Sequence, residues 1–323
     1  MLVLMTDVPV QRRAVSGRRC AEEPLLSPVV LGRLPDRARE VVEYRKSGLS
    51  LNHIQGCPLG CSYCIRHTYG LWDNQRPVAL TSDAEAVAEL VGHRYFQPHV
   101  TPVQLFNRAT DPFLPQVEPH TMAVLRDLDA RGLTNHVLVI TRHTVNQAHC
   151  AALNELTHLK VTLLFTWSGI DDTRIEPFPS HVAARSLTTA FEHADRYRTV
   201  FYWRPIVPGL NDTPDHLRHA RRLAEHAHAT VFTGLFYRDD IAAYYRANGV
   251  PQPYEGTARR NIVPAELERR ILDAFPSGTG PLFRKTSCAV SYAHAMPDYN
   301  GHVGIRELCD ICPTAQRQRC AAT

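Results

Sequence analysis

Short apolar runs alternate along the middle of the chain with longer stretches in which apolar residues recur every three or four positions. A nearly continuous apolar run predicts a strand that helices cover, as in a parallel sheet, and a spacing of three to four predicts an amphipathic helix. The predicted strands cover residues 49–54, 103–106, 137–141, 161–167, 199–207 and 230–237. The predicted helices between them cover residues 82–93, 119–131, 145–156, 180–197 and 214–228. Ser82 with Glu85 three residues later is typical of a capping box at a helix start.

This alternation of strands and helices predicts the α/β class. Six such units in series favour a partial (β/α)6 TIM-type barrel with a C-terminal cysteine-rich extension, and a flat doubly wound sheet is the alternative. We expect an N-terminal extension at 1–45, the barrel at 46–237, linker or lid helices at 238–281 and the cysteine-rich tail at 282–323. On either architecture, active sites gather at the carboxyl ends of the strands.

Composition excludes several classes of protein. The 323 residues are 44% apolar and 21% charged, which excludes a disordered or low-complexity chain. No stretch approaches the roughly 20 apolar residues of a membrane span. Asp7 interrupts the first apolar residues before they reach the length of a secretory signal, so we expect a cytoplasmic protein. The net charge of +4 comes from scattered arginines, which usually form a solvated surface and only weakly indicate nucleic-acid binding.

Cysteine clustering points to metal ligation. Nine cysteines in a reducing compartment are not expected to form disulfides, and seven of them fall into two groups. The first group, Cys57, Cys61 and Cys64, follows a predicted strand with the spacing C-x3-C-x2-C. Three thiolates leave one metal position open, and on a [4Fe–4S] cluster that open iron can bind a substrate or cofactor. The alternative is a zinc site completed by His53 or His67.

The spacing of the first group resembles that of the radical S-adenosylmethionine (SAM) enzymes. In that family the open iron of a [4Fe–4S] cluster chelates SAM. Reductive cleavage of SAM gives a 5′-deoxyadenosyl radical, which abstracts hydrogen from the substrate. The resemblance places Tyr63, the residue before the third cysteine, beside the adenine. It also implies an electron donor such as a flavodoxin or a ferredoxin.

Further segments resemble the spore photoproduct lyase-like branch of this family. They include Thr110-Asp111-Pro112-Phe113, Ile140-Thr141-Arg142, Trp167-Ser168, Glu176-Pro177, Arg185 and residues 205–212. The resemblance implies that Thr110 and Asp111 bind the ammonium of SAM, that Ser168 and Arg185 bind its carboxylate or ribose, and that Ile206 forms a floor for adenine. These residue types suit a zwitterion that needs both acceptors and charged donors.

The second cysteine group consists of Cys288, Cys309, Cys312 and Cys320. Four thiolates can ligate zinc or a second iron–sulfur cluster. Pro313 directly after Cys312 is typical of ferredoxin-type ligation, so we favour an auxiliary [4Fe–4S] cluster over zinc. A metal would also order a tail that has little apolar content.

The predicted function is therefore hydrogen abstraction from an unreactive C–H bond by a radical SAM enzyme. Similarity to the lyase-like branch indicates a small-molecule substrate of nucleoside or nucleotide type. The auxiliary cluster equally suits a peptide-modifying enzyme, which is the alternative. A zinc-stabilised nucleic-acid-binding protein is the second alternative.

Overall fold

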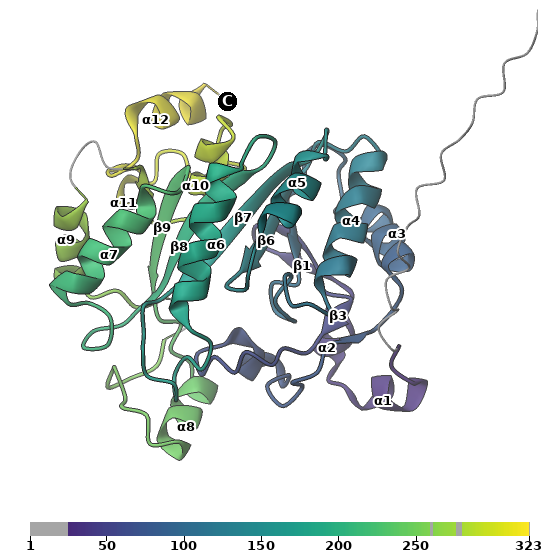
Figure 1. Ribbon diagram of the computed structural model, residues 1–323, viewed down its shortest axis with the longest axis horizontal. Coiled ribbons are helices and arrows are strands. Elements are labelled where there is room, and N and C mark those ends of the chain that lie inside the picture. The colour runs from purple at the N-terminus through teal and green to yellow at the C-terminus, as the bar shows by residue number, and fades with distance from the viewer. Residues whose placement is uncertain (1–24, 259–260, 276–279, 323) are drawn as a thin grey trace, which may run out of the picture.

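The computed structural model describes residues 25–258, 261–275 and 280–322. Within them the larger sheet has eight strands in the order β1-β2-β5-β6-β7-β8-β9-β10. The strands β2, β5, β6, β7, β8 and β9 run parallel and correspond to the six predicted strands (Figure 1). The strand bounds are β1 Val42–Arg45, β2 Gly48–Leu51, β5 Val103–Leu105, β6 His136–Thr141, β7 Lys160–Trp167, β8 Arg198–Ile206, β9 Ala229–Gly234 and β10 Leu282–Phe283.

The order of the parallel strands in space follows their order in the chain. A doubly wound sheet requires a reversal of that order, so the connecting helices here lie on one face and the partial barrel is confirmed. These helices are α3 Asp83–Gly92, α4 Glu118–Ala130, α5 Gln147–Asn154, α6 Ser180–Glu192 and α7 Pro214–Ala224. The predicted capping box at Ser82 and Glu85 is confirmed at the start of α3.

The front of the described chain departs from the prediction at residues 49–54. That segment divides into β2 and the short β3 Ile54–Gln55, which pairs with β4 Val78–Ala79 in a separate sheet. Asn52 lies between them and donates from its side chain to the carbonyl of Ser50 at 3.2 Å. The other elements here are α1 Pro28–Arg33, α2 Asp36–Arg39 and the 3₁₀ helix η1 Ile65–Tyr69. Residues 1–24 of the expected N-terminal extension lie outside the described residues.

The two faces of the large sheet bury different sets of residues. Outward side chains such as Val139, Phe165 and Trp203 pack in one apolar core with the connecting helices. Inward side chains such as Leu138 and Tyr202 form a second core on the concave face. This alternation is the period of two that a strand imposes.

The cysteine-rich segment supplies the cover of the concave face. Leu282–Phe283 forms β10, which pairs with β9, and α10 Thr286–Ala293 packs its Ala289 and Val290 into the second core. Thus residues predicted to form a tail extend the sheet and close its inner face. The boundaries of the four expected segments remain a prediction. The remaining helices are α8 Asp239–Ala247, α9 Ala265–Ala274, α11 Arg306–Cys309 and α12 Thr314–Ala321.

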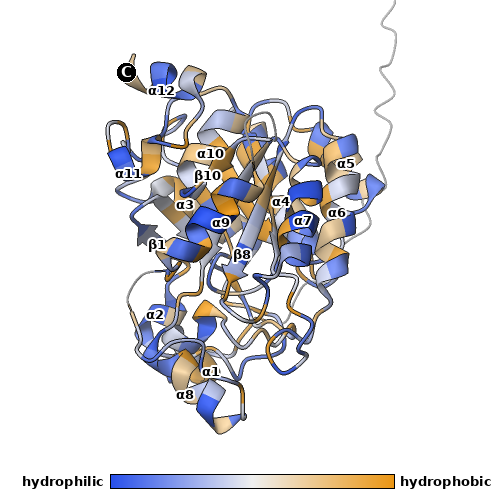
Figure 2. Ribbon diagram, turned by 90° about the vertical axis from the view of Figure 1, so that its left-hand side faces the viewer, coloured by the Kyte–Doolittle hydropathy of each residue, from blue (hydrophilic) through white to orange (hydrophobic). Residues whose placement is uncertain are grey.

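Helices on the outside of the molecule expose polar residues. The helix α9 is coloured largely as hydrophilic, and of its residues only Leu267 and Ile271 are buried (Figure 2). None of the helices in the described part of the chain combines the length and the hydrophobicity of a membrane span.

Candidate active site

The three front cysteines lie in a loop that leaves β3 at Gly56. Gly56 has a φ of 109°, and a Cβ atom there would lie 2.0 Å from the carbonyl oxygen of Arg76. Only glycine therefore fits this position without a backbone shift. The buried Arg66 holds the loop closed, because its guanidinium donates to the carbonyl of Cys57 at 2.6 Å and to the carbonyl of Asn74 at 2.6 Å.

The cysteines of this loop lie in a largely buried environment. Cys57 and Cys61 are each 8% exposed, and Cys64 is half-buried. Burial raises the pKa of Cys57 to about 11, and burial with nearby Glu176 raises the pKa of Cys61 to about 12. Cysteine binds a metal as a thiolate, so iron binding at this loop has to release the thiol protons. The positive charge of the bound iron then compensates the negative charge of the buried thiolates.

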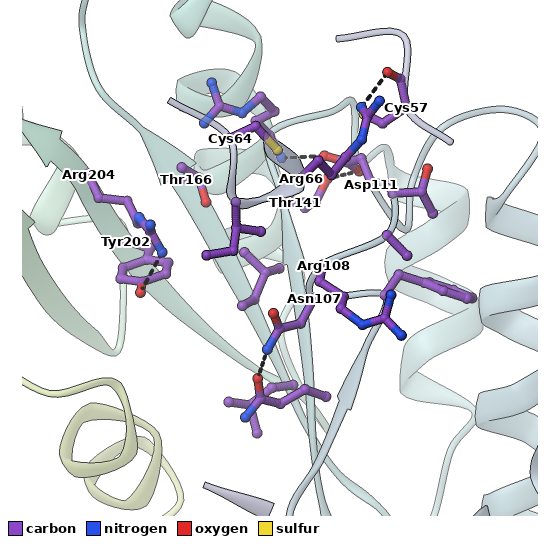
Figure 3. Close-up of a pocket in the computed structure, with 18 of the residues that line it drawn as sticks. Cys57, Cys64, Arg66, Asn107, Arg108, Asp111, Thr141, Thr166, Tyr202 and Arg204 are labelled. Carbon is purple, nitrogen blue, oxygen red and sulfur yellow. Dashed lines mark hydrogen bonds between the residues drawn. The ribbon is translucent and has the colours of Figure 1, made fainter. Parts of the chain in front are cut away.

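The three cysteines line a cavity of about 350 Å³, which lies within the usual range for small-molecule sites. Figure 3 shows Cys57 and Cys64 at one end of it, above Asp111 and Thr141. Asp111 comes from the carboxyl side of β5, where the sequence placed it. Its carboxylate accepts hydrogen bonds from the Thr141 hydroxyl at 2.6 Å and from the backbone N–H groups of Arg142 and Phe113 at 2.9 and 3.0 Å. Asp111 is therefore held in one orientation at the cavity wall.

A buried network of charged and polar groups lies behind the cysteine loop. The Arg142 guanidinium is 2.9 Å from the Glu176 carboxylate and lies 5.5 Å from the centre of the Tyr63 ring. Glu176 also accepts hydrogen bonds from the Tyr63 hydroxyl and, at 2.6 Å, from the hydroxyl of Ser168. Burial raises the pKa of Tyr63 well above its usual value, so its phenol stays protonated and donates.

The residues predicted to contact SAM divide into two sets. Tyr63, Thr110 and Asp111 line the cavity together with the cysteines, and the Thr110 hydroxyl donates to the carbonyl of Gly56 at 2.5 Å. The others are not among its lining residues: Ser168 and Ile206 are fully buried behind the wall, and Arg185 is exposed on α6.

The two histidines considered as zinc ligands lie outside the cavity that the cysteines line. His53 bonds through Nε2 to Asp83 at 2.7 Å, and the His67 ring stacks on Trp72 at 3.9 Å between centroids.

The front donor set of three thiols differs from that of a closed zinc site, which has four protein ligands. Cys57, Cys61 and Cys64 lie close enough to interact electrostatically. These residues therefore fit a [4Fe–4S] cluster with one open iron. At the C-terminal group, the ligand atoms of Cys288, Asp298 and His302 lie within 4.8 Å of one another.

The four C-terminal cysteines also come together. Cys288 lies in the first turn of α10, and its pKa is raised to about 12 by burial and then by Asp298, Cys312, Cys309 and Cys320. Cys320 accepts a hydrogen bond from the backbone N–H of Asp298 at 3.3 Å. The neighbouring residues Thr286, Ser287 and Tyr299 line the same cavity as the front cysteines, so both cysteine groups adjoin one cavity.

Sequence reasoning missed several residues that line this cavity. They are Arg45, Arg66, Gln104, Asn107, Arg108, Thr166, Tyr202, Arg204, Thr286 and Ser287. The alternation of side chains along a strand predicts the positions of Thr166, Tyr202 and Arg204, because every second residue of β7 and β8 points to the inner face. Arg45 and Arg108 reach the cavity from the hairpin and from the loop after β5, and no local pattern signals that.

Comparisons with known proteins bear on the fold. No protein-family model and no curated protein matches the chain. Among solved structures, spore photoproduct lyase complexed with dinucleoside spore photoproduct is 12% identical, with a TM-score of 0.54 over 75% of this chain and 78% of that one. A mutant of that lyase with bound AdoMet and dinucleoside spore photoproduct is 12% identical, with a TM-score of 0.53 over 75% and 78%. The chain shares their partial-barrel fold.

Proposed function

We propose that this chain is a radical SAM enzyme that reductively cleaves SAM and abstracts hydrogen from an unreactive C–H bond. One observation carries the proposal. Three cysteines of a single loop, spaced C-x3-C-x2-C, line the cavity at the carboxyl side of the parallel strands, beside a fixed carboxylate at Asp111. Active sites of this fold gather at that edge.

Cys57, Cys61 and Cys64 would hold a [4Fe–4S] cluster, and Asp111, Thr110 and Tyr63 would contact SAM. When bound, such a cluster with one open iron supplies the electron for cleaving SAM, and the protein directs the resulting chemistry. The likeness in fold to a lyase mutant with bound AdoMet supports this assignment. Ser168, Arg185 and Ile206 remain candidates for contacts with SAM, and in this structure they stand behind or outside the cavity wall.

The chain's own residues prepare the site for this cofactor pair. Arg66 fixes the carbonyl groups of the cysteine loop, so the thiols keep their positions before metal binds. Asp111 offers an ionised carboxylate to an ammonium group, with its orientation set by three donors. Arg142 lies beside Cys61 and balances the negative charge of a thiolate in a low-dielectric wall.

A small molecule of nucleoside or nucleotide type is the proposed substrate class. The structurally similar lyase was solved with a dinucleoside, and the cavity has the volume of a small-molecule site. Phe106 and Tyr202 give this cavity aromatic surface on which a base can stack. A cytoplasmic location and an electron donor such as a flavodoxin or a ferredoxin belong to the same proposal.

The C-terminal cysteines are proposed to hold an auxiliary [4Fe–4S] cluster with four protein ligands. The electrostatic interactions among their thiols and Pro313 directly after Cys312 support this proposal. Because all four positions are protein thiolates, a redox or structural role suits this cluster better than substrate binding.

The experiment is anaerobic reconstitution with iron and sulfide, then reduction and addition of SAM, with 5′-deoxyadenosine measured by mass spectrometry. The wild-type chain and the control Cys150→Ala should both form it, because Cys150 is buried on α5 away from both cysteine groups. Cys61→Ala should form at least 100-fold less. Equal product from the two variants, or colourless wild-type protein that contains only zinc, would contradict the proposal.

A further inference from the structure

Arginines dominate the charged lining of the cavity. Of its lining residues, five are arginines and one, Asp111, is acidic. The five are Arg45, Arg66, Arg108, Arg142 and Arg204. Two of them lie at the cysteine loop: Arg66 donates to backbone carbonyl groups, and Arg142 forms an ion pair with Glu176. The other three need a separate explanation.

Arg45 and Arg108 share one carboxylate. Arg108 Nε lies 2.7 Å and Arg45 NH2 lies 3.2 Å from the same oxygen of Glu43. Both guanidinium groups also lie over the Tyr69 ring, at 5.5 and 5.1 Å from its centre for Arg45 and Arg108 respectively. Two positive charges against one negative charge leave this pair with a surplus of one.

Donor groups of this pair are buried without a hydrogen-bond partner. The side chain of Arg108 is fully buried, and its NH1 forms no hydrogen bond within the described part of the chain. Arg45 is half-buried, and its Nε and NH2 atoms likewise form no hydrogen bond there, although NH2 lies in the ion pair with Glu43. The surplus positive charge of this pair therefore lies in a partly buried wall, where water screens it less than at an open surface, and it attracts an anion in the cavity.

Arg204 adds a second surplus charge. It projects from β8 and donates to the Tyr202 hydroxyl at 2.9 Å, with its guanidinium 4.9 Å from the centre of that ring. Among the described residues no carboxylate forms an ion pair with it. Figure 3 shows Arg204 and Arg108 at opposite sides of the drawn cavity, with Asn107 between them.

We propose that the substrate is an anion whose phosphate or carboxylate group lies in the cavity between Arg204 and the Arg45–Arg108 pair. The inference rests on the proposed function, because it takes this cavity as the reaction site. Guanidinium groups match both oxyanions in charge and geometry, and two unbalanced positive charges at the cavity favour an anion over a neutral or cationic ligand. The arginines thereby select the substrate, while the cysteine loop and Asp111 serve the cofactors.

The test measures binding to the reconstituted, SAM-loaded chain by isothermal titration calorimetry. Two matched pairs of probes are used: thymidine 5′-phosphate with thymidine, and succinate with succinamide. We expect the anion of at least one pair to bind at least tenfold more tightly than its neutral partner. A preference within the thymidine pair indicates a phosphate group on the substrate, and a preference within the succinate pair indicates a carboxylate group. Equal affinity within both pairs, or no measurable binding of either anion, would overturn the proposal.

Three variants assign the effect to the arginines. Arg204→Gln and Arg45→Gln should each weaken anion binding about tenfold and leave binding of the neutral probe within twofold. Arg218→Gln is the matched control, because Arg218 is exposed on α7 and lies outside the cavity. Unchanged anion affinity in both cavity variants would also overturn the proposal. Formation of 5′-deoxyadenosine without substrate is followed on the same preparation, so a failure of the proposed function is recognised separately.

Discussion

The Arg142 guanidinium and the Glu176 carboxylate form a buried ion pair at 2.9 Å, with side-chain exposures of 10% and 1%. The pair joins the loop after β6 to the segment that follows β7, and it lies directly behind the cysteine loop. Cys61 and Glu176 act against the desolvation of Arg142, and together they raise its pKa well above the usual value, so the arginine remains charged.

Removing one partner of this pair should be strongly destabilising. Glu176→Gln leaves a buried guanidinium without its counter-charge, and we expect a loss of about 3–5 kcal/mol in the free energy of unfolding. Urea denaturation under anaerobic conditions measures it. The control is Asp127→Asn, which breaks the exposed pair with Arg131 and should cost less than about 1 kcal/mol. Similar losses in the two variants would contradict a buried pair.

A substitution at Gly56 should impair iron binding at the cysteines that follow it. Gly56→Ala places a methyl group against the carbonyl oxygen of Arg76 at a φ that L-residues rarely adopt. We expect lower stability and a loss of more than half of the iron taken up at the front cysteines, measured by iron analysis and absorbance. Gly92→Ala is the control, because a Cβ atom at Gly92 meets nothing within 4 Å. Full iron uptake by Gly56→Ala would show that the loop tolerates the shift.

The cover of the concave face makes a prediction about the C-terminal segment. Phe283 on β10 is 1% exposed and packs in the second core, so Phe283→Ala should cost about 3–5 kcal/mol of stability. Ile305→Ala, at a site that is 41% exposed, should change stability by no more than about 0.5 kcal/mol. Unfolding in urea separates the two. A small effect at Phe283 would mean that the segment is a detachable tail, as its composition first indicated.

Stability should fall in mild acid because of a buried histidine. Burial, helped by Lys160, lowers the pKa of His136 to about 4, whereas an unfolded chain has a histidine pKa near 6.5. Between these two values the unfolded state binds the proton and the folded state does not, so stability is lost as the pH falls from 6.5 toward 4. This residue alone should contribute a loss of about 2 kcal/mol between pH 7 and pH 5. Denaturant midpoints at the two pH values measure the loss.

The matched variants for this prediction are His136→Gln and His181→Gln. Replacing the buried His136 should make the acid-dependent loss smaller by about that amount. Replacing His181, which is exposed on α6, should leave the loss as it is in the wild type. Identical pH dependence in the wild type and His136→Gln would contradict the assignment.

The auxiliary site should be separable from the front one. Cys312→Ala should lose about half of the iron of the wild type and still form 5′-deoxyadenosine from SAM, because the front cysteines remain intact. Iron analysis and mass spectrometry provide the two readouts, with Cys150→Ala as the control. Complete loss of SAM cleavage at full front-site occupancy would make the second cluster part of the cleavage step itself.

Much of the barrel could be predicted from the sequence because its signals are local. The strands β6, β7 and β8 are apolar runs, and the capping residue Ser82 marks the start of its helix within a few positions. The cysteine spacing and Asp111 were equally local, and the structure brings them to one cavity wall.

What could not be predicted depends on contacts between distant segments. The apolar residues of α10, among them Ala289 and Val290, join a core only because the concave face of the sheet lies against them. Arg45 and Arg108 reach the cavity through a shared Glu43, a relationship that spans more than sixty positions of the chain. Likewise, Arg142 and Glu176 lie in segments that resemble the lyase-like branch, but the sequence does not predict that these two side chains form an ion pair.

The most direct measurement is electron–nuclear double resonance on the reduced, reconstituted chain with SAM labelled with ¹⁵N at its amino group. To isolate the front site, the sample carries Cys309→Ala and Cys312→Ala. We expect a hyperfine coupling between the cluster and the labelled nitrogen, and this ¹⁵N coupling should disappear when unlabelled SAM replaces the labelled compound. A reduced cluster without that coupling, or one with a histidine nitrogen in the same position, would contradict an iron kept open for SAM by Cys57, Cys61 and Cys64.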